Sequence, residues 1–143
     1  MAIRILMKII IILLFSVPVF AQPVIDYGGT RLQSDTIIRN VVIKNAVIDA
    51  NPYQQIFDTT VWLQNCKIER ISPLWFGMKS TNTDNTKYLQ HTFDNARQNG
   101  TYNFYIPAGD YTYSGTWFLH HLVANEYQGW SMRIYGDGNM WSS

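Results

Sequence analysis

A ten-residue pattern occurs twice in this chain, with the second copy twenty residues after the first. Residues 41–50 read VVIKNAVIDA, and residues 61–70 read VWLQNCKIER. Both copies are apolar at their first, third and eighth positions and place an asparagine fifth, as Asn45 and Asn65. The apolar segments are only three to five residues long, which is too short for ordinary hairpins. Repetition at this period predicts a stacked solenoid, in which each unit covers the next.

Strands of this length are typical of a parallel β-helix, in which each coil lies about 4.8 Å above the one before. Asn45 and Asn65 are then expected at a bend, because asparagine tolerates a left-handed backbone and its amide can hydrogen-bond along a column. The alternative is a chance match between two β-rich segments, since three or more repeats are the norm. In the solenoid the apolar residues stack as buried columns: Val41 over Val61, Ile43 over Leu63, and Ile48 over Ile68.

The N-terminus has the pattern of a targeting segment. Arg4 and Lys8 come before an unbroken apolar run over 9–15, and small residues precede the expected cleavage point. This pattern predicts a secretory signal peptide over residues 1–21, with Met7 as an alternative start. An uncleaved anchor is the other interpretation, but the apolar run is short for a membrane span of ~20 residues. The mature protein is therefore expected to be secreted, periplasmic or extracellular, and not bound to a membrane.

Composition limits the partners and the means of stabilisation. The net charge is +1, and it becomes −1 when Arg4 and Lys8 leave with the signal peptide. Nucleic acid is not expected as a partner, because it requires a basic face. Cys66 is the only cysteine, so no internal disulfide can form, and a buried small residue is its expected role. Aromatic residues make up 15% of the chain, a level that suits both β-rich folds and sugar-binding surfaces.

The centre of the chain predicts a single helix over 86–99. The sequence Asp84-Asn85-Thr86 can cap its start, and Gly100 follows its end. Leu89 and Phe93 begin an apolar stripe at helical spacing. Strands are expected on both sides of this helix, over 36–38, 41–43, 46–48, 102–106, 111–113, 117–123 and 131–135.

Several short motifs in the second half of the chain carry a family resemblance. They are FGMK at 76–79, TDNT at 83–86, IPAGDY at 106–111 and IYGDG at 134–138, with the predicted helix between the second and the third. Their order resembles the opening segment of the pectate-lyase-like superfamily, which includes pectate lyases, polygalacturonase-type glycoside hydrolases and phage tailspikes. The resemblance covers about residues 72–143. It departs from the family pattern before the helix, where Ser-Thr-Asn replaces Gly-Asp-Gly and one residue is missing.

The resemblance implies an all-β fold, a right-handed parallel β-helix with one capping α-helix. Residues 22–143 would form its N-terminal coils and cap. The resembled enzymes carry their catalytic residues several coils further along. The chain is thus expected to be the truncated N-terminal part of a secreted polysaccharide-degrading protein, either a pectate lyase or a glycoside hydrolase, and inactive alone. Polysaccharide is the expected partner, and Ca²⁺ is an expected cofactor only if the full protein is a lyase.

Two alternatives stay open beside that interpretation. The chain can be a complete short protein instead of a truncated one. Its function can also be non-catalytic, as a glycan-binding or structural β-helix of the tailspike or surface-stalk type.

Asp49 and Glu69 are the candidate catalytic residues. They occupy the same position in the two copies of the repeat, so they are expected about one strand spacing apart. Two carboxylates at ~5 Å have the separation found in retaining glycosidases. The alternative is a pair of like charges on a solvated edge, neutralised by Lys44, Lys67 or Arg70.

Three residues are candidates for contact with carbohydrate: Tyr113, Trp117 and His120. Core packing is the alternative for Trp117. His120 and His121 are neighbours on a predicted strand and face opposite sides, so no metal site is expected there. Asp137 lies between two glycines, which is typical of a turn.

Overall fold

The computed structural model describes residues 21–116, 121–123, 126–128 and 133–137. Apart from Ala21, the predicted signal peptide lies outside these described residues. The first sheet contains three parallel strands, in the order β1 (Val24–Asp26), β2 (Val42–Lys44) and β4 (Trp62–Gln64).

The register of this sheet follows the sequence repeat. Ile43 of β2 lies opposite Leu63 of β4, and β1 pairs with β2 in the same parallel sense through Ile25. The prediction that the two copies stack with an offset of twenty residues is confirmed by this pairing.

Parallel contacts also form two further columns. In the second column, β3 (Val47–Ile48) pairs with β5 (Lys67–Ile68), and Arg31 bridges to Val47 on the other side. In the third column Ile38 bridges to Phe57, whose N–H donates to the carbonyl of Trp75 at 2.8 Å. The chain therefore returns to the same three columns in successive segments.

Asparagines occupy the corner between the first two columns, as the repeat predicts. Asn45 and Asn65 are both left-handed, with φ of 55° and 52°. The Nδ2 of Asn65 donates to the Oδ1 of Asn45 at 2.6 Å. The Nδ2 of Asn45 donates in turn to the carboxylate of Asp26 at 2.9 Å. The expected amide ladder is confirmed, and it extends one step further, to Asp26.

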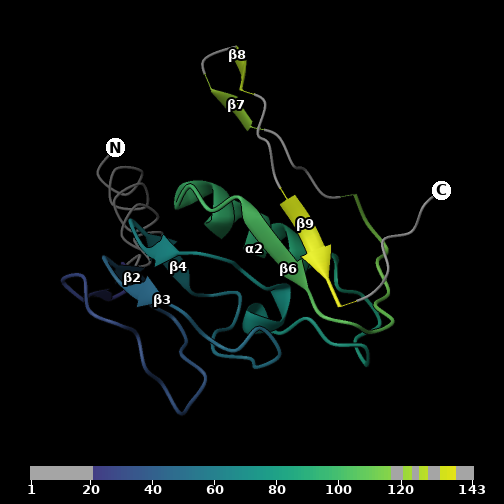
Figure 1. Cartoon of the computed structure of the whole chain (residues 1–143), viewed down its shortest axis with the longest axis horizontal. Coiled ribbons are helices and arrows are strands. Elements are labelled where there is room, and N and C mark those ends of the chain that lie inside the picture. Colours follow the sequence, from purple (N-terminus) through teal and green to yellow (C-terminus); the bar gives the residue numbers. More distant parts are fainter. Residues whose placement is uncertain (1–20, 117–120, 124–125, 129–132, 138–143) are drawn as a thin grey trace, which may run out of the picture.

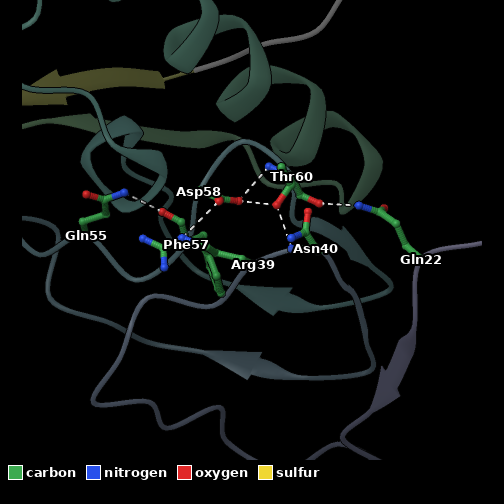
Figure 2. A network of polar contacts seen from close by, with 7 residues as sticks. All are labelled: Gln22, Arg39, Asn40, Gln55, Phe57, Asp58 and Thr60. Atoms are coloured by element: carbon green, nitrogen blue, oxygen red, sulfur yellow. Dashed lines mark hydrogen bonds and ion pairs between the residues drawn. The ribbon is translucent and has the colours of Figure 1, made fainter. Parts of the chain in front are cut away.

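A second polar network joins the turns that precede β2 and β4 (Figure 2). The hydroxyl of Thr60 accepts from the N–H of Asn40 at 2.7 Å, and these two residues are also twenty positions apart. Asp58 accepts from the N–H of Thr60 at 2.8 Å and is paired with Arg39 at 3.4 Å. Gln22 donates to the carbonyl of Thr60 at 2.7 Å. The two copies of the repeat are thus connected by side chains as well as by the sheets.

The inward side chains form one continuous apolar core. Cys66 belongs to it, and burial raises the pKa of its thiol, in agreement with its predicted role as a buried small residue. All six residues of the expected apolar columns are buried: Val41, Val61, Ile43, Leu63, Ile48 and Ile68.

The helix α2 (Thr86–Gln98) lies between the β2–β4 strands and the strands β6 and β9 (Figure 1). Its predicted stripe is buried, and the ring of Phe93 stacks on Phe104 with 4.2 Å between centroids. Gly100 follows the helix with a left-handed φ of 63°, as expected for a glycine stop.

A row of polar side chains on α2 covers the outer edge of β4. Alternate residues of a strand direct their backbone N–H and C=O groups to opposite sides. Trp62 and Gln64 use these groups to bond the β2 segment, so the backbone groups of Val61 and Leu63 point away from β2. His91 donates to the carbonyl of Val61 at 2.8 Å, and Asn95 accepts from the N–H of Leu63 at 2.8 Å. Asn99 donates to the carbonyl of Leu63 at 2.9 Å. The helix therefore takes the place of a fourth strand beside β4.

The chain returns to parallel pairing after the helix. Ile71 bridges to Phe104 of β6 (Asn103–Ile106), and β6 pairs in parallel with β9 (Arg133–Gly136). The strands β7 (His121–Val123) and β8 (Glu126–Gln128) form an antiparallel pair.

Several local predictions are wrong. Residues 111–113 form no strand, and residues 36–38 contribute only the single bridge of Ile38, because neither segment has a continuous backbone partner. The short 3-10 helix η1 (Pro73–Phe76) and the strand β8 were not predicted.

The start of α2 is capped within the predicted segment 84–86, and Asp84 supplies the cap. Asn85 stands at the N-cap position, but its side chain makes no capping hydrogen bond. Asp84 accepts from the N–H of Thr86 at 2.9 Å instead. Hydrogen bonds from Ser114, and then from Thr86, lower the pKa of Asp84.

Candidate functional site

The predicted acidic pair lies at one surface hollow. Asp49 directly follows β3 and Glu69 directly follows β5, so the parallel pairing of these strands brings both residues to the same edge. The hollow has a volume of about 430 Å³. Both carboxylates line it, together with Arg31, Val47, Ile48, Lys67 and Ile68.

The charges at this hollow are arranged differently from the prediction. Asp49 forms an ion pair with Arg31, and both side chains are more than half exposed. The cation that pairs with Asp49 is therefore Arg31, and not Lys44, Lys67 or Arg70 as predicted. Arg31 reaches Asp49 because its segment forms the neighbouring coil of the same column.

The other charged residues of the hollow are available to a ligand. Lys67 and Glu69 are both exposed, and neither has an ion-pair partner among the residues that the structure describes. Arg70 is directed elsewhere, over the ring of Tyr105 at 5.7 Å from its centroid.

A second hollow of about 510 Å³ adjoins the first, and the two share Val47 and Lys67. Its lining includes the ladder residues Asn45 and Asn65. We call the two hollows together the β3–β5 groove. The groove runs across successive coils and offers amide, ammonium and carboxylate groups above an apolar floor. Such a surface can hydrogen-bond a hydroxylated chain that lies across the coils.

The acidic pair does not have the arrangement of a catalytic dyad. In glycosidases both carboxylates face the scissile bond from its two sides. Here Asp49 is already bound to Arg31, whereas Glu69 has no such partner among the described residues. The groove therefore fits binding of a polar chain better than acid–base cleavage.

Tyr113, one of the predicted carbohydrate contacts, is not among the residues that line this groove. Tyr113 is 38% exposed, and its hydroxyl lies 3.6 Å from the sulfur of Met78. Burial, and then the neighbouring Tyr111, raise the pKa of Tyr113. Trp117 and His120 lie outside the described residues.

Sequence reasoning missed a cluster in which two tyrosines share one carboxylate. The hydroxyls of Tyr53 and Tyr105 both donate to Asp137, and they lie 3.0 Å from each other. The hydrogen bond to Asp137, and then the one to Tyr53, raise the pKa of Tyr105. The hydrogen bonds that Asp137 accepts from Tyr105, and then from Tyr53, lower the pKa of Asp137.

Few features of the sequence indicate this cluster. Tyr53 and Asp137 are 84 positions apart, and Asp137 stands between glycines, so it was interpreted as a turn residue only. The parallel pairing of Tyr105 in β6 with Tyr135 in β9 is what brings Asp137 close to the two hydroxyls.

The described residues contain no group of three or more His, Cys, Asp or Glu side chains that could hold a metal ion. No helix within the described ranges is long and apolar enough to span a membrane.

Comparison of the chain with protein-family models, with curated proteins and with solved structures gives no match. The resemblance to the pectate-lyase-like superfamily therefore depends on the motifs of residues 72–143 alone.

Proposed function

We propose that this chain binds polysaccharide, as the N-terminal segment of a secreted polysaccharide-degrading protein with a right-handed parallel β-helix fold. In this proposal the chain supplies the first coils, the helix α2 and a glycan-binding surface. Cleavage is assigned to other coils of the same protein.

The observation that carries the proposal is the β3–β5 groove. It crosses two neighbouring coils, and its polar groups are spaced by the stacking of those coils. An extended polymer of hydroxylated rings matches such a surface because it offers hydrogen-bonding groups at regular intervals. Lys67 and Asn65 lie within the groove and are the residues with the clearest ability to donate hydrogen bonds to it.

The solenoid part of the proposal is supported by the three columns of parallel contacts described above. Segments about twenty residues apart pair in the first and second columns, and the third column follows the same order. The export part is supported by the signal-peptide pattern of residues 1–21.

The direct test is binding of the exported protein to polysaccharides. Affinity electrophoresis or calorimetry with a polyuronide and with neutral polysaccharides should detect binding to at least one polymer. Lys67→Ala combined with Asn65→Gly should weaken it, and Lys87→Ala on α2 serves as the control because Lys87 lies outside the groove. No binding to any polymer, or equal binding by the groove variant, contradicts the proposal.

A product assay separates the degrading protein from the stalk-like alternative. Unsaturated products indicate a lyase, and new reducing ends without unsaturation indicate a hydrolase. Binding without either product favours a glycan-binding β-helix of the tailspike type.

A further inference from the structure

A second pocket lies on a different part of the molecule, between the segment that follows Pro52 and the loop that precedes α2. Its volume is about 320 Å³. None of its lining residues belongs to the β3–β5 groove. They are Tyr53, Gln55, Leu74, Met78, Lys79, Ser80, Thr81 and Tyr111.

The two aromatic walls of this pocket are fixed at their hydroxyl ends. Tyr53 is 56% exposed, yet its hydroxyl is bound to Asp137 and lies 3.0 Å from that of Tyr105. The hydroxyl of Tyr111 donates to the carbonyl of Pro107 at 3.2 Å. An exposed tyrosine that keeps one ring orientation supplies contact area to a ligand at little cost in conformational entropy.

The third wall, the loop over 77–82, is fixed by a buried asparagine. Asn85 has 0% exposure, and its side chain accepts from the N–H of Lys79 at 3.1 Å and donates to the carbonyl of Lys79 at 2.9 Å. Asn82 donates to the carbonyl of Gly77 at 3.0 Å. Asn85 therefore does not cap α2, because its side chain holds this loop. The pocket is formed before any ligand arrives, as is usual for small-molecule sites.

The lining has the chemistry of a site for one sugar ring. A six-membered sugar presents C–H groups on its faces and hydroxyls at its rim. Tyr53 and Tyr111 can pack against the faces, and Gln55, Ser80 and Thr81 can hydrogen-bond the hydroxyls.

The charge at the pocket comes from Lys79, the one charged side chain among its described lining residues. The carboxylate of Asp137 accepts from the hydroxyls of Tyr53 and Tyr105 and does not line the pocket. The ammonium group of Lys79 can therefore bind a hydroxyl or a carboxylate of a ligand.

We propose that this pocket binds a single sugar residue, and that Asp137 is a positioning residue that acts through Tyr53. The site is additional to the groove of the proposed function and independent of it. Its ligand is one ring, such as the end or a side branch of a glycan, whereas the groove takes an extended chain.

The test uses the exported protein and a panel of methyl glycosides of glucose, galactose, mannose and N-acetylglucosamine, with galacturonic acid and glucuronic acid as charged comparators. Saturation-transfer NMR and calorimetry should detect at least one of the glycosides, with a Kd in the millimolar range. The two acids should bind at least as tightly as the neutral glycosides, because the ammonium group of Lys79 lies at the lining. Detection of none of these sugars, or exclusion of both acids, overturns the proposal.

Variants separate this pocket from the groove. Tyr53→Ala should weaken binding about tenfold, because it removes one aromatic wall. Ser80→Trp should block the pocket from an exposed position without altering the core. Lys67→Ala in the groove, and Tyr102→Ala at a tyrosine that is 55% exposed outside the pocket, should leave binding unchanged. Loss of binding in Lys67→Ala, or full binding in Ser80→Trp, refutes the assignment to this pocket.

A double-mutant cycle tests the positioning role of Asp137. Tyr53→Phe keeps the ring but loses the hydroxyl, and Asp137→Ala loses the acceptor. Each should weaken binding to a similar extent, and the double variant should be no weaker than either one, because both remove the same link. Asp137→Asn keeps an acceptor oxygen and should restore most of the affinity. Additive losses, or no restoration by Asn, would show that Asp137 does not act through Tyr53.

Discussion

Replacement of Asn95 by alanine should measure how strongly α2 depends on its polar row. Asn95 is fully buried, and its Oδ1 accepts from the backbone N–H of Leu63 at 2.8 Å. The alanine variant leaves this N–H inside the protein without its acceptor, which costs about 1–3 kcal/mol. The better helix propensity of alanine offsets this loss by at most about 0.7 kcal/mol. The expected net loss in the free energy of unfolding is therefore about 1–2 kcal/mol.

Urea denaturation and amide hydrogen exchange provide the assay. With a urea dependence of roughly 1–3 kcal/mol/M for a domain of this size, the midpoint should fall by about 1 M. Exchange at the Leu63 amide should become faster. The amide of Trp62 should be affected less, because it donates to the carbonyl of Val41 inside the sheet. Gln98→Ala, at the exposed end of α2, is the control and should leave the midpoint nearly unchanged.

The reasoning fails if Asn95→Ala is as stable as the Gln98→Ala control. It also fails if the Leu63 amide keeps its protection in the variant. Either result would mean that the edge of β4 does not need the side chain of Asn95.

Three further predictions concern other parts of the fold. Burial lowers the pKa of His91 from its ordinary value of 6.5, so the folded protein favours the neutral ring. The free energy of unfolding should therefore be highest above about pH 6.5 and decline as the pH falls toward the lower folded pKa. His91→Gln should remove this part of the pH dependence, as measured by urea denaturation at several pH values. Asn65 has a φ of 52°, so Asn65→Ala should melt below Asn65→Gly, with about 1–2 kcal/mol between the two variants, and equal melting temperatures would argue against backbone strain. A Cβ on Gly136 would clash with the carbonyl oxygen of Ile106, so Gly136→Ala should separate β9 from β6 and speed proteolysis within β6. An unchanged cleavage pattern would contradict this pairing.

The repeat was enough to predict the register of β2 with β4 and of β3 with β5. The apolar residues Val41, Ile43 and Ile48 have apolar equivalents in the second copy, and the parallel pairing places equivalent positions side by side. The left-handed asparagines could be predicted for the same reason, because few other residues tolerate that backbone. Local pattern and stacking agree in this region.

The sequence was less informative about side chains that bind residues far away along the chain. The stripe of Leu89 and Phe93 predicted which face of α2 is buried. The row of His91, Asn95 and Asn99 was overlooked, although its spacing of four residues is visible in the sequence. Polar residues at that spacing are usually interpreted as a solvated helix face, and only the position of the β4 edge shows what they bind.

In the candidate site, too, contacts within the repeat could be predicted and contacts outside it could not. The repeat correctly brought Asp49 and Glu69 to one edge, since both follow paired strands. The partner of Asp49 could not be predicted, because Arg31 belongs to a segment without the repeat pattern. The link between Tyr53 and Asp137 depends on the pairing of β6 with β9, whose offset of thirty residues has no counterpart in the repeat.

The amide ladder at the corner has a direction, and this direction has an evolutionary consequence. Asn65 donates to Asn45, and Asn45 donates to Asp26, whose ionised carboxylate can only accept. A duplicated unit of twenty residues, inserted between the two copies with an asparagine in the same place, would accept one bond and donate one. Every neighbouring bond would keep its chemical type. The length of such a protein can therefore change by whole units through gene duplication, without redesign of the residues on either side.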